Sequence, residues 1–151
     1  MSISVQPGDP RHPDAMALLH QSHALMESLF PPEDNHFLDI DALCAPEISF
    51  YVAMLNGKIL GTAALANKGA YGEVKSMFVA PDTRGLGVGA HLLAHLESEA
   101  RARALPALKL ETGNLLTEAH RLYARAGFAL CAPFGDYVEN SSSLFMEKQL
   151  N

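Results

Sequence analysis

The chain has 151 residues with a formal net charge of −6 at pH 7, and 48% of the residues are apolar while 19% are charged. This size and composition are typical of one globular domain, residues 1–151, and they argue against long disordered segments and repeats. The sequence holds no apolar run of roughly 18 residues, no signal-peptide pattern and no block of basic residues, so we expect a cytoplasmic protein that binds neither membranes nor nucleic acids.

The N-terminal part of the chain predicts one strand and two helices. Residues 3–6 alternate weakly between apolar and polar, as in an edge strand. In residues 13–30 the apolar side chains recur at helical spacing, and the two prolines that follow end the helix. Residues 32–46 are acidic and bounded by prolines, so we expect only a short helix there, at about residues 39–43.

Three strands follow in the middle of the chain. Residues 48–54 and 58–66 are strand-like runs joined by a turn that contains Asn56-Gly57, which is the strongest short-range signal for an antiparallel hairpin. Residues 71–79 form a further strand-like run after a glycine turn. We therefore expect a three-stranded antiparallel meander.

Glycines at alternate positions, Gly85, Gly87 and Gly89, stand between this third strand and a run of helix formers. Glycine lets the backbone approach a ligand closely, and the unpaired N–H groups at the start of a helix attract phosphate. Read as Gly85-x-Gly87-x-x-Ala90, the stretch matches the fingerprint of dinucleotide-binding folds, and Glu111 stands about twenty residues downstream, where that fold holds a ribose.

A second interpretation of the same stretch is a pyrophosphate loop, Arg84-x-x-Gly87-x-Gly89, which carries its own arginine. The order of elements favours it. A dinucleotide fold places its fingerprint on the first strand of a parallel unit, whereas here the predicted antiparallel meander comes first.

The rest of the chain predicts two helices and three strands. They are a helix at 87–103, a strand at 107–112, a helix at 115–126 with Gly127 as its C-cap, and strands at 128–134 and 144–150. The predicted fold class is thus α/β (α+β): a mixed, mostly antiparallel sheet with one central parallel β-α-β crossover and flanking helices.

Two segments together carry a resemblance to a known family. "VKSMFVAPDTRGLGVGAHLL" at 74–93 and "EAHRLYARAGF" at 118–128 resemble the GNAT superfamily of acyl-CoA-dependent N-acyltransferases, and the predicted element order is similar to that fold over the whole chain. The resemblance implies an enzyme that transfers an acetyl group directly from acetyl-CoA to an amine acceptor within a ternary complex. The alternative from another class is a non-catalytic module that binds acyl-CoA without a productive acceptor site.

The resemblance also implies which residues bind CoA. In the family the loop before the long helix holds the pyrophosphate, and a splayed strand before it offers backbone amides to the thioester. Many members carry an asparagine seven residues before the tyrosine of the second segment, where this chain has Leu116, and Asn114 is the nearest substitute. The implied CoA-binding residues are Met77, Phe78, Val79, Arg84, Gly85, Leu86, Gly87, Val88, Gly89, Ala90, Asn114 and Tyr123.

Acyl transfer to an amine needs an acid for the departing thiolate and a base for the ammonium. By resemblance Tyr123 is the acid, and the alternative is a tyrosine that only packs beneath the sheet. Glu73 matches the position of the base in some members. Because Lys75 shares its strand face, a surface ion pair between Glu73 and Lys75 is the alternative for this residue.

Acceptor recognition is expected from two loops. Residues 33–41 carry four carboxylates, of which Asp39 and Asp41 are the predicted substrate contacts, and Asp136 and Tyr137 are the corresponding residues of the loop before the last strand. A site entrance lined by these carboxylates would favour a cationic amine. The alternative interpretation of residues 33–41 is a solvated acidic loop with no role in binding.

We expect no metal site, since His91 and His95 are spaced as in zinc proteases but lack the required glutamate between them. Cys44 and Cys131 stand beside apolar or small residues, which predicts buried free thiols. The predicted exposed edge strands favour a homodimer.

Overall fold

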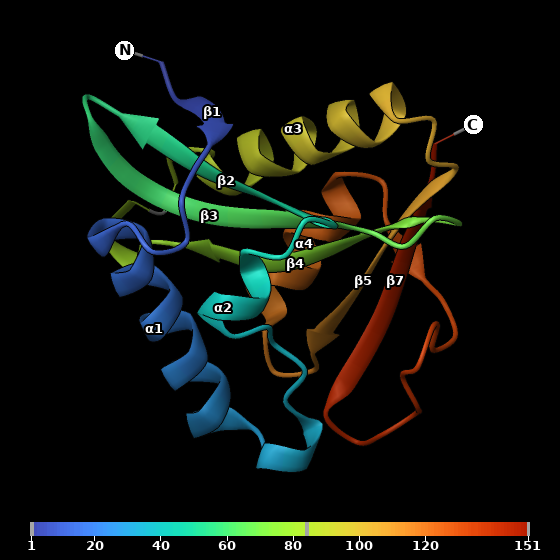
Figure 1. Cartoon of the computed structure of the whole chain (residues 1–151). Helices are drawn as coiled ribbons and strands as arrows, with labels where there is room; N and C mark the ends of the chain where they lie inside the picture. Colours follow the sequence, from blue (N-terminus) through green and yellow to red (C-terminus); the bar gives the residue numbers. More distant parts are fainter. Residues whose placement is uncertain (1, 84, 151) are drawn as a thin grey trace.

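The structure of the protein is a computed structural model that describes residues 2–83 and 85–150. The predicted CoA contact of Arg84 therefore lies outside the described residues. Within the described residues, seven strands form one sheet in the order β1-β2-β3-β4-β5-β7-β6, with helices on both of its faces (Figure 1).

The elements follow the predicted order along the chain. The strands are β1 (Ser4–Pro7), β2 (Ile48–Leu55), β3 (Lys58–Asn67), β4 (Gly72–Val79), β5 (Ala107–Gly113), β6 (Ala129–Leu130) and β7 (Ser143–Gln149). The helices are α1 (Pro13–Leu29), α2 (Ile40–Leu43), α3 (Val88–Ala102) and α4 (Thr117–Arg125), with 3-10 turns η1 (Pro32–Asp34) and η2 (Pro81–Thr83).

The sheet is antiparallel except between β4 and β5, which pair in parallel on either side of the α3 crossover. This confirms the predicted mixed sheet. It also removes the dinucleotide interpretation, because that fold requires a mostly parallel sheet.

Two predictions about local structure were wrong. The predicted strand at 128–134 is reduced to the two residues of β6, because Pro133 lacks an N–H for a ladder and the chain leaves the sheet after Cys131. The thiols are free, as expected, but Cys44 is exposed and Cys131 half-buried. Cys44 lies at the C-terminal end of the short surface helix α2, which does not cover it.

Apolar side chains form one cluster on each face of the sheet. Alternation along β3 places Ala63 and Leu65 under α3 and α4, in a cluster with Leu92 and Leu96, and it turns Ala64 toward α1 on the opposite face. Figure 1 shows α1 and α2 on one side of the strands and α3 on the other. The central strands are thus buried on both faces, and this packing fixes the positions of their side chains.

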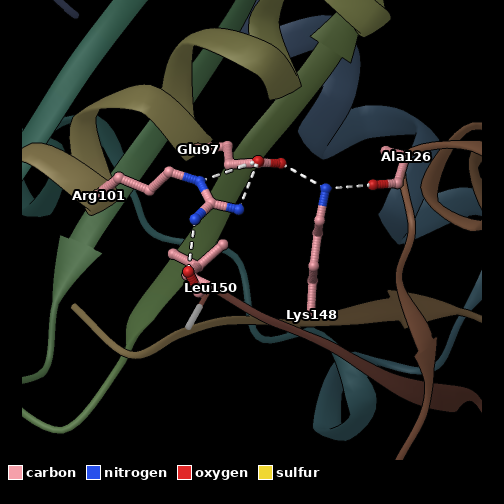
Figure 2. A network of polar contacts seen from close by, with 5 residues as sticks. All are labelled: Glu97, Arg101, Ala126, Lys148 and Leu150. Carbon is pink, nitrogen blue, oxygen red and sulfur yellow. Dashed lines mark hydrogen bonds and ion pairs between the residues drawn. The ribbon is translucent and has the colours of Figure 1, made fainter. Parts of the chain in front are cut away.

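A polar network anchors α3 to the last strand of the chain (Figure 2). Glu97 of α3 accepts hydrogen bonds from Arg101, one turn further along the helix, and from Lys148 of β7 at 2.5 Å. Lys148 also donates to the carbonyl oxygen of Ala126 at 2.7 Å, and Arg101 donates to that of Leu150. The hydrogen bond from Lys148 lowers the pKa of Glu97, so the network stays charged at neutral pH. It fixes α3 relative to both α4 and β7.

Candidate active site between strands β4 and β5

Strands β4 and β5 pair at their first residues only. The parallel ladder joins Gly72 to Leu108 and Glu73 to Lys109, and the two strands separate beyond that point. The expected splay of the strand before the glycine loop is thereby confirmed. The separation leaves the backbone of the second half of β4 without a strand partner on its β5 side.

A bulge in β4 sets the direction of the peptide group at the opening. The β3–β4 register shifts between Thr62 and Ala64, and Ser76 adopts a φ of +52°, which is uncommon for a residue other than glycine. The hydroxyl of Thr62 donates to the carbonyl oxygen of Ser76 at 2.8 Å. Because a trans peptide is planar, the N–H of Met77 points away from Thr62.

A cleft of about 120 Å³ lies at this opening. Its walls come from the end of α1 and the segment after it, from the separated parts of β4 and β5, and from α4. The lining residues used below are Phe30, Asp34, Lys75, Ser76, Met77, Glu111, Tyr123 and Ser142. The cleft thus places Met77, one of the predicted CoA-binding residues of β4, beside Tyr123, the predicted acid.

The glycine loop leads into α3. Gly85 and Gly87 have φ values of +87° and +80°, so both positions favour glycine, and Gly87 caps the helix without a side-chain hydrogen bond. The first N–H groups of α3 have no partner within the helix and remain available to an anion. Gly89 has a packing role as well, since a Cβ there would lie 2.8 Å from Cδ2 of Leu122 in α4.

Tyr123 projects from α4 into the buried side of the cleft and is 6% exposed. Its ring packs edge-on against Phe128, with the centroids 5.9 Å apart. Burial, and to a smaller extent the charge of Glu111, raises the pKa of its hydroxyl well above the ordinary value. The hydroxyl therefore carries its proton across the whole physiological pH range.

Glu73 and Tyr137, which the sequence assigned to base and acceptor roles, lie in direct contact. The Tyr137 hydroxyl donates to Oε2 of Glu73 at 2.5 Å, and Nζ of Lys75 lies 3.4 Å from the same oxygen. Lys75 also donates to the carbonyl oxygen of His36 at 2.9 Å. The pairing of Glu73 with Lys75, which the sequence left as an alternative, is observed, but the pair does not lie on the surface, since the two side chains are only 4% and 11% exposed.

Glu111 of β5 lines the cleft, and the sequence reasoning did not assign it to acyl transfer. The hydroxyl of Ser143 donates to its Oε2 at 2.7 Å, and burial raises the pKa of its carboxyl group. A sequence signal did exist: "LKLETG" places a carboxylate near the carboxyl end of the strand that completes the parallel crossover. Ligands of open α/β sheets commonly bind beyond that end.

The carboxylates of the acidic segment, residues 33–41, lie at two separate places in the structure. Asp34 lines the cleft and accepts from the Ser142 hydroxyl at 2.6 Å. Asp39 instead caps α2 by accepting from the N–H of Ala42, and Asp41 pairs with Arg11 at 2.8 Å on the surface. Asp39 and Asp41 border a separate hollow, so the structure does not bring them to the cleft.

Two further predicted residues lie at the loop before β7. Asn114 donates from its side chain to the carbonyl oxygen of Ser141 at 2.9 Å and so holds that loop at the end of β5. Asp136 is exposed. In the described part of the chain no group of three or more His, Cys, Asp or Glu side chains is arranged to hold a metal ion. None of the described helices is long and apolar enough to cross a membrane.

Comparison with known protein families identifies the family of the chain. Residues 16–128 match the model of the Acetyltransferase (GNAT) family. The chain belongs to this family. Within GNAT proteins, it is 41% identical over 151 residues to an IAA acetyltransferase of Azospirillum brasilense, a match that covers 99% of each chain.

Solved GNAT structures agree with this assignment. A Klebsiella pneumoniae protein described as an acyl-CoA N-acyltransferase superposes with a TM-score of 0.82 at 29% identity, and the match covers 99% of this chain and 98% of the other. A GNAT family acetyltransferase from Elizabethkingia anophelis, solved with acetyl-CoA bound, superposes with a TM-score of 0.70 at 20% identity over 98% of both chains. The latter supports the likeness in fold.

Proposed function

We propose that this GNAT protein transfers an acetyl group from acetyl-CoA to a primary amine, directly and with both substrates bound. The observation that carries the proposal is the separation of β4 from β5, which opens a cleft between the bulged strand and the buried Tyr123. The relatives that are named or described as acetyltransferases support the reaction class.

The proposed donor site combines two sets of backbone N–H groups. Those at the start of α3, together with Arg84, hold the pyrophosphate of CoA, because an anion gains roughly 0.3–1 kcal/mol from the helix dipole and more from charge-assisted hydrogen bonds. The N–H of Met77 polarises the thioester carbonyl. Thr62 supports this role by fixing the peptide between Ser76 and Met77.

The proposed chemistry removes two protons from the acceptor ammonium and delivers one to the thiolate. The amine attacks the thioester carbon, the C–N bond forms, and the C–S bond breaks with its electron pair on sulfur. Tyr123 donates the proton that converts the thiolate to the thiol. One of two carboxylates, the buried Glu73 or the half-buried Glu111, takes the first proton of the acceptor ammonium.

Acetyl-CoA is expected to raise the melting temperature of the protein, whereas NAD is not. At a hundred times its dissociation constant a ligand adds about 2.7 kcal/mol to the stability, which is roughly 5–10 °C at this chain length. Thermal denaturation with each ligand measures the shift. A shift with NAD and none with CoA would contradict the proposed donor.

A screen of amines that monitors release of free CoA then separates an enzyme from a non-catalytic module. The enzyme releases CoA in proportion to one class of acceptor. A binding module shows the thermal shift and releases CoA with none of them.

We propose further that the acceptor is cationic and that Asp34 contributes to its recognition. The printed names of relatives point to different acceptors: one is an IAA acetyltransferase and another an aminoalkylphosphonate N-acetyltransferase. The acceptor of this chain therefore has to be argued from its own cleft. Asp34 and Glu111 both line that cleft, and they give it a negative wall suited to an ammonium group.

Neutralising the acidic segment provides the test. Asp34→Asn is expected to raise KM for the amine about tenfold, the effect of losing roughly 1.4 kcal/mol, and to leave KM for acetyl-CoA unchanged. Asp39→Asn combined with Asp41→Asn is the matched control, and it also tests the expectation that these two residues bind the acceptor. If the double variant alone raises KM for the amine, recognition lies in the second hollow and not in the cleft.

A further inference from the structure

We infer that Glu111, and not Glu73, is the base that takes the proton from the acceptor amine, while Glu73 positions the two loops at the mouth of the cleft. The inference rests on the proposed function and names a catalytic residue for it. It assigns different tasks to two carboxylates that stand on neighbouring strands.

The first argument is access. Glu111 lines the cleft together with Ser76, Met77 and Tyr123, so its carboxylate borders the space in which the thioester and the amine would meet. Ser143 holds Oε2, while Oε1 has no hydrogen bond to any described residue. One oxygen is thus fixed by the protein and the other is available to an ammonium group.

The second argument concerns the surroundings of Glu73. Its side chain is 4% exposed and does not line the cleft. Its Oε2 already accepts the Tyr137 hydroxyl and faces the ammonium of Lys75. Through Lys75 and Tyr137 this carboxylate connects β4 to the segment at His36 and to the loop before β7, which is a positioning role.

The third argument is electrostatic. Burial raises the pKa of Glu111. The ordinary pKa values are about 4.3 for a glutamate carboxyl and about 10.4 for an alkylammonium, so a raised carboxyl pKa brings the two closer and makes proton transfer less unfavourable. The groups that face Glu111 act in both directions. Ser143, His36 and Lys75 favour its charged form, while Glu73 opposes it, and the Tyr123 and Tyr137 hydroxyls stay protonated beside it.

The proton balance follows from these assignments. The ammonium gives one proton to Glu111, which later releases it to solvent. After the C–N bond forms, the nitrogen still carries one proton more than the amide product. Tyr123 gives its proton to the thiolate and regains one from that nitrogen, so one proton leaves per acetyl group transferred.

Glutamine variants at both positions test the inference, since glutamine keeps the size and cannot take the proton. Glu111→Gln is expected to lower kcat/KM for the amine about 100-fold at pH 7 and to recover as rising pH deprotonates the free amine. Its thermal shift with CoA should equal that of the wild type. Glu111→Asp, which keeps a carboxylate, should restore part of the activity.

Stability distinguishes catalytic from structural loss in the same variants. Because the folded-state pKa of Glu111 is raised, ionisation of this group costs stability as the pH rises through that pKa. Glu111→Gln should therefore have a melting temperature at least as high as that of the wild type at pH 8. Any excess over the wild type should disappear below pH ~4, where the carboxyl of Glu111 is protonated in both the folded and the unfolded state. Glu73→Gln should melt lower because it leaves Lys75 buried without its charged partner, yet keep the shape of the wild-type pH profile.

Glu147→Gln makes the same chemical change in a carboxylate that pairs with Lys109 outside the cleft, and it should leave the profile unchanged. A wild-type pH profile in Glu111→Gln, or a loss at pH 7 that recovers at higher pH in Glu73→Gln alone, overturns the inference while acetyl transfer itself stands. If the wild-type protein acetylates no amine, the proposed function fails and this inference fails with it.

Discussion

Replacing Tyr123 with phenylalanine is expected to lower kcat about 100-fold, the low end for loss of a general acid, and to leave the affinity for CoA unchanged. The substitution removes one hydroxyl and keeps the ring that packs against Phe128, so the fold should be preserved. The raised pKa of the hydroxyl means that its proton is present at every pH below about 9, so the loss should be uniform over that range.

Steady-state kinetics between pH 6 and 9, together with the thermal shift on CoA addition, measure these two effects. Phe128→Leu is a control for ring packing, because it removes the edge-on partner without touching the hydroxyl. Full turnover by the phenylalanine variant would show that water protonates the thiolate and that Tyr123 is only a packing residue.

Arg121 and Arg125 flank Tyr123 in the sequence, but the structure does not bring them to the cleft. Residues two apart on a helix point in different directions, so both arginines are exposed while Tyr123 is buried. Among the described residues, Lys75 lines the cleft and brings a positive charge to it.

Replacing Lys75 with methionine is expected to destabilise the protein by about 3 kcal/mol, because it leaves the Glu73 carboxylate buried without its charged partner. At this chain length the melting temperature should fall by roughly 6–12 °C. Adding Glu73→Gln to Lys75→Met should recover most of the loss, since the pair is then removed as a whole. Chemical denaturation of the two single variants and the double variant gives the coupling energy.

Arg11→Met is the matched control for this cycle. It breaks the ion pair between Arg11 and Asp41, whose side chains are 54% and 87% exposed respectively, and should cost much less stability than Lys75→Met because solvent screens this pair. Equal losses in Lys75→Met and Arg11→Met would mean that the Glu73 pair behaves as a surface pair. The segment at His36 and the loop before β7 would then have to be held in place by other contacts.

Much of the fold follows from local signals in the sequence. The Asn56-Gly57 turn lies between β2 and β3 as predicted, and both of its residues adopt positive φ, at 52° and 78°. The strand at 128–134 was overestimated because apolar residues there face other loops as well as the sheet. Phe134 packs against Tyr71 and Tyr137, outside any ladder.

Only part of the candidate site could be predicted from the sequence, for a physical reason. A motif such as the glycine loop is local, so spacing alone places it at the start of α3. The surroundings of Glu73 depend on Tyr137, which is 64 residues away, and Glu111 reaches the cleft only because β4 and β5 separate. The contact between Glu73 and Tyr137 has no signature in a short stretch of chain, whereas the local signal for Glu111 is its place near the carboxyl end of β5.

Strand β7 comes after the other six strands in the described chain, yet it lies between β5 and β6 in the sheet. Its ladder with β5 runs from Gly113 opposite Ser143 to Ala107 opposite Gln149, so every pair joins residues far apart in sequence. Such a topology has a high contact order, and folding is slow when loops must close before strand pairs are gained. Until β7 inserts, β5 presents an open edge that other chains can pair with. Folding yield should therefore depend on how quickly this one strand is captured.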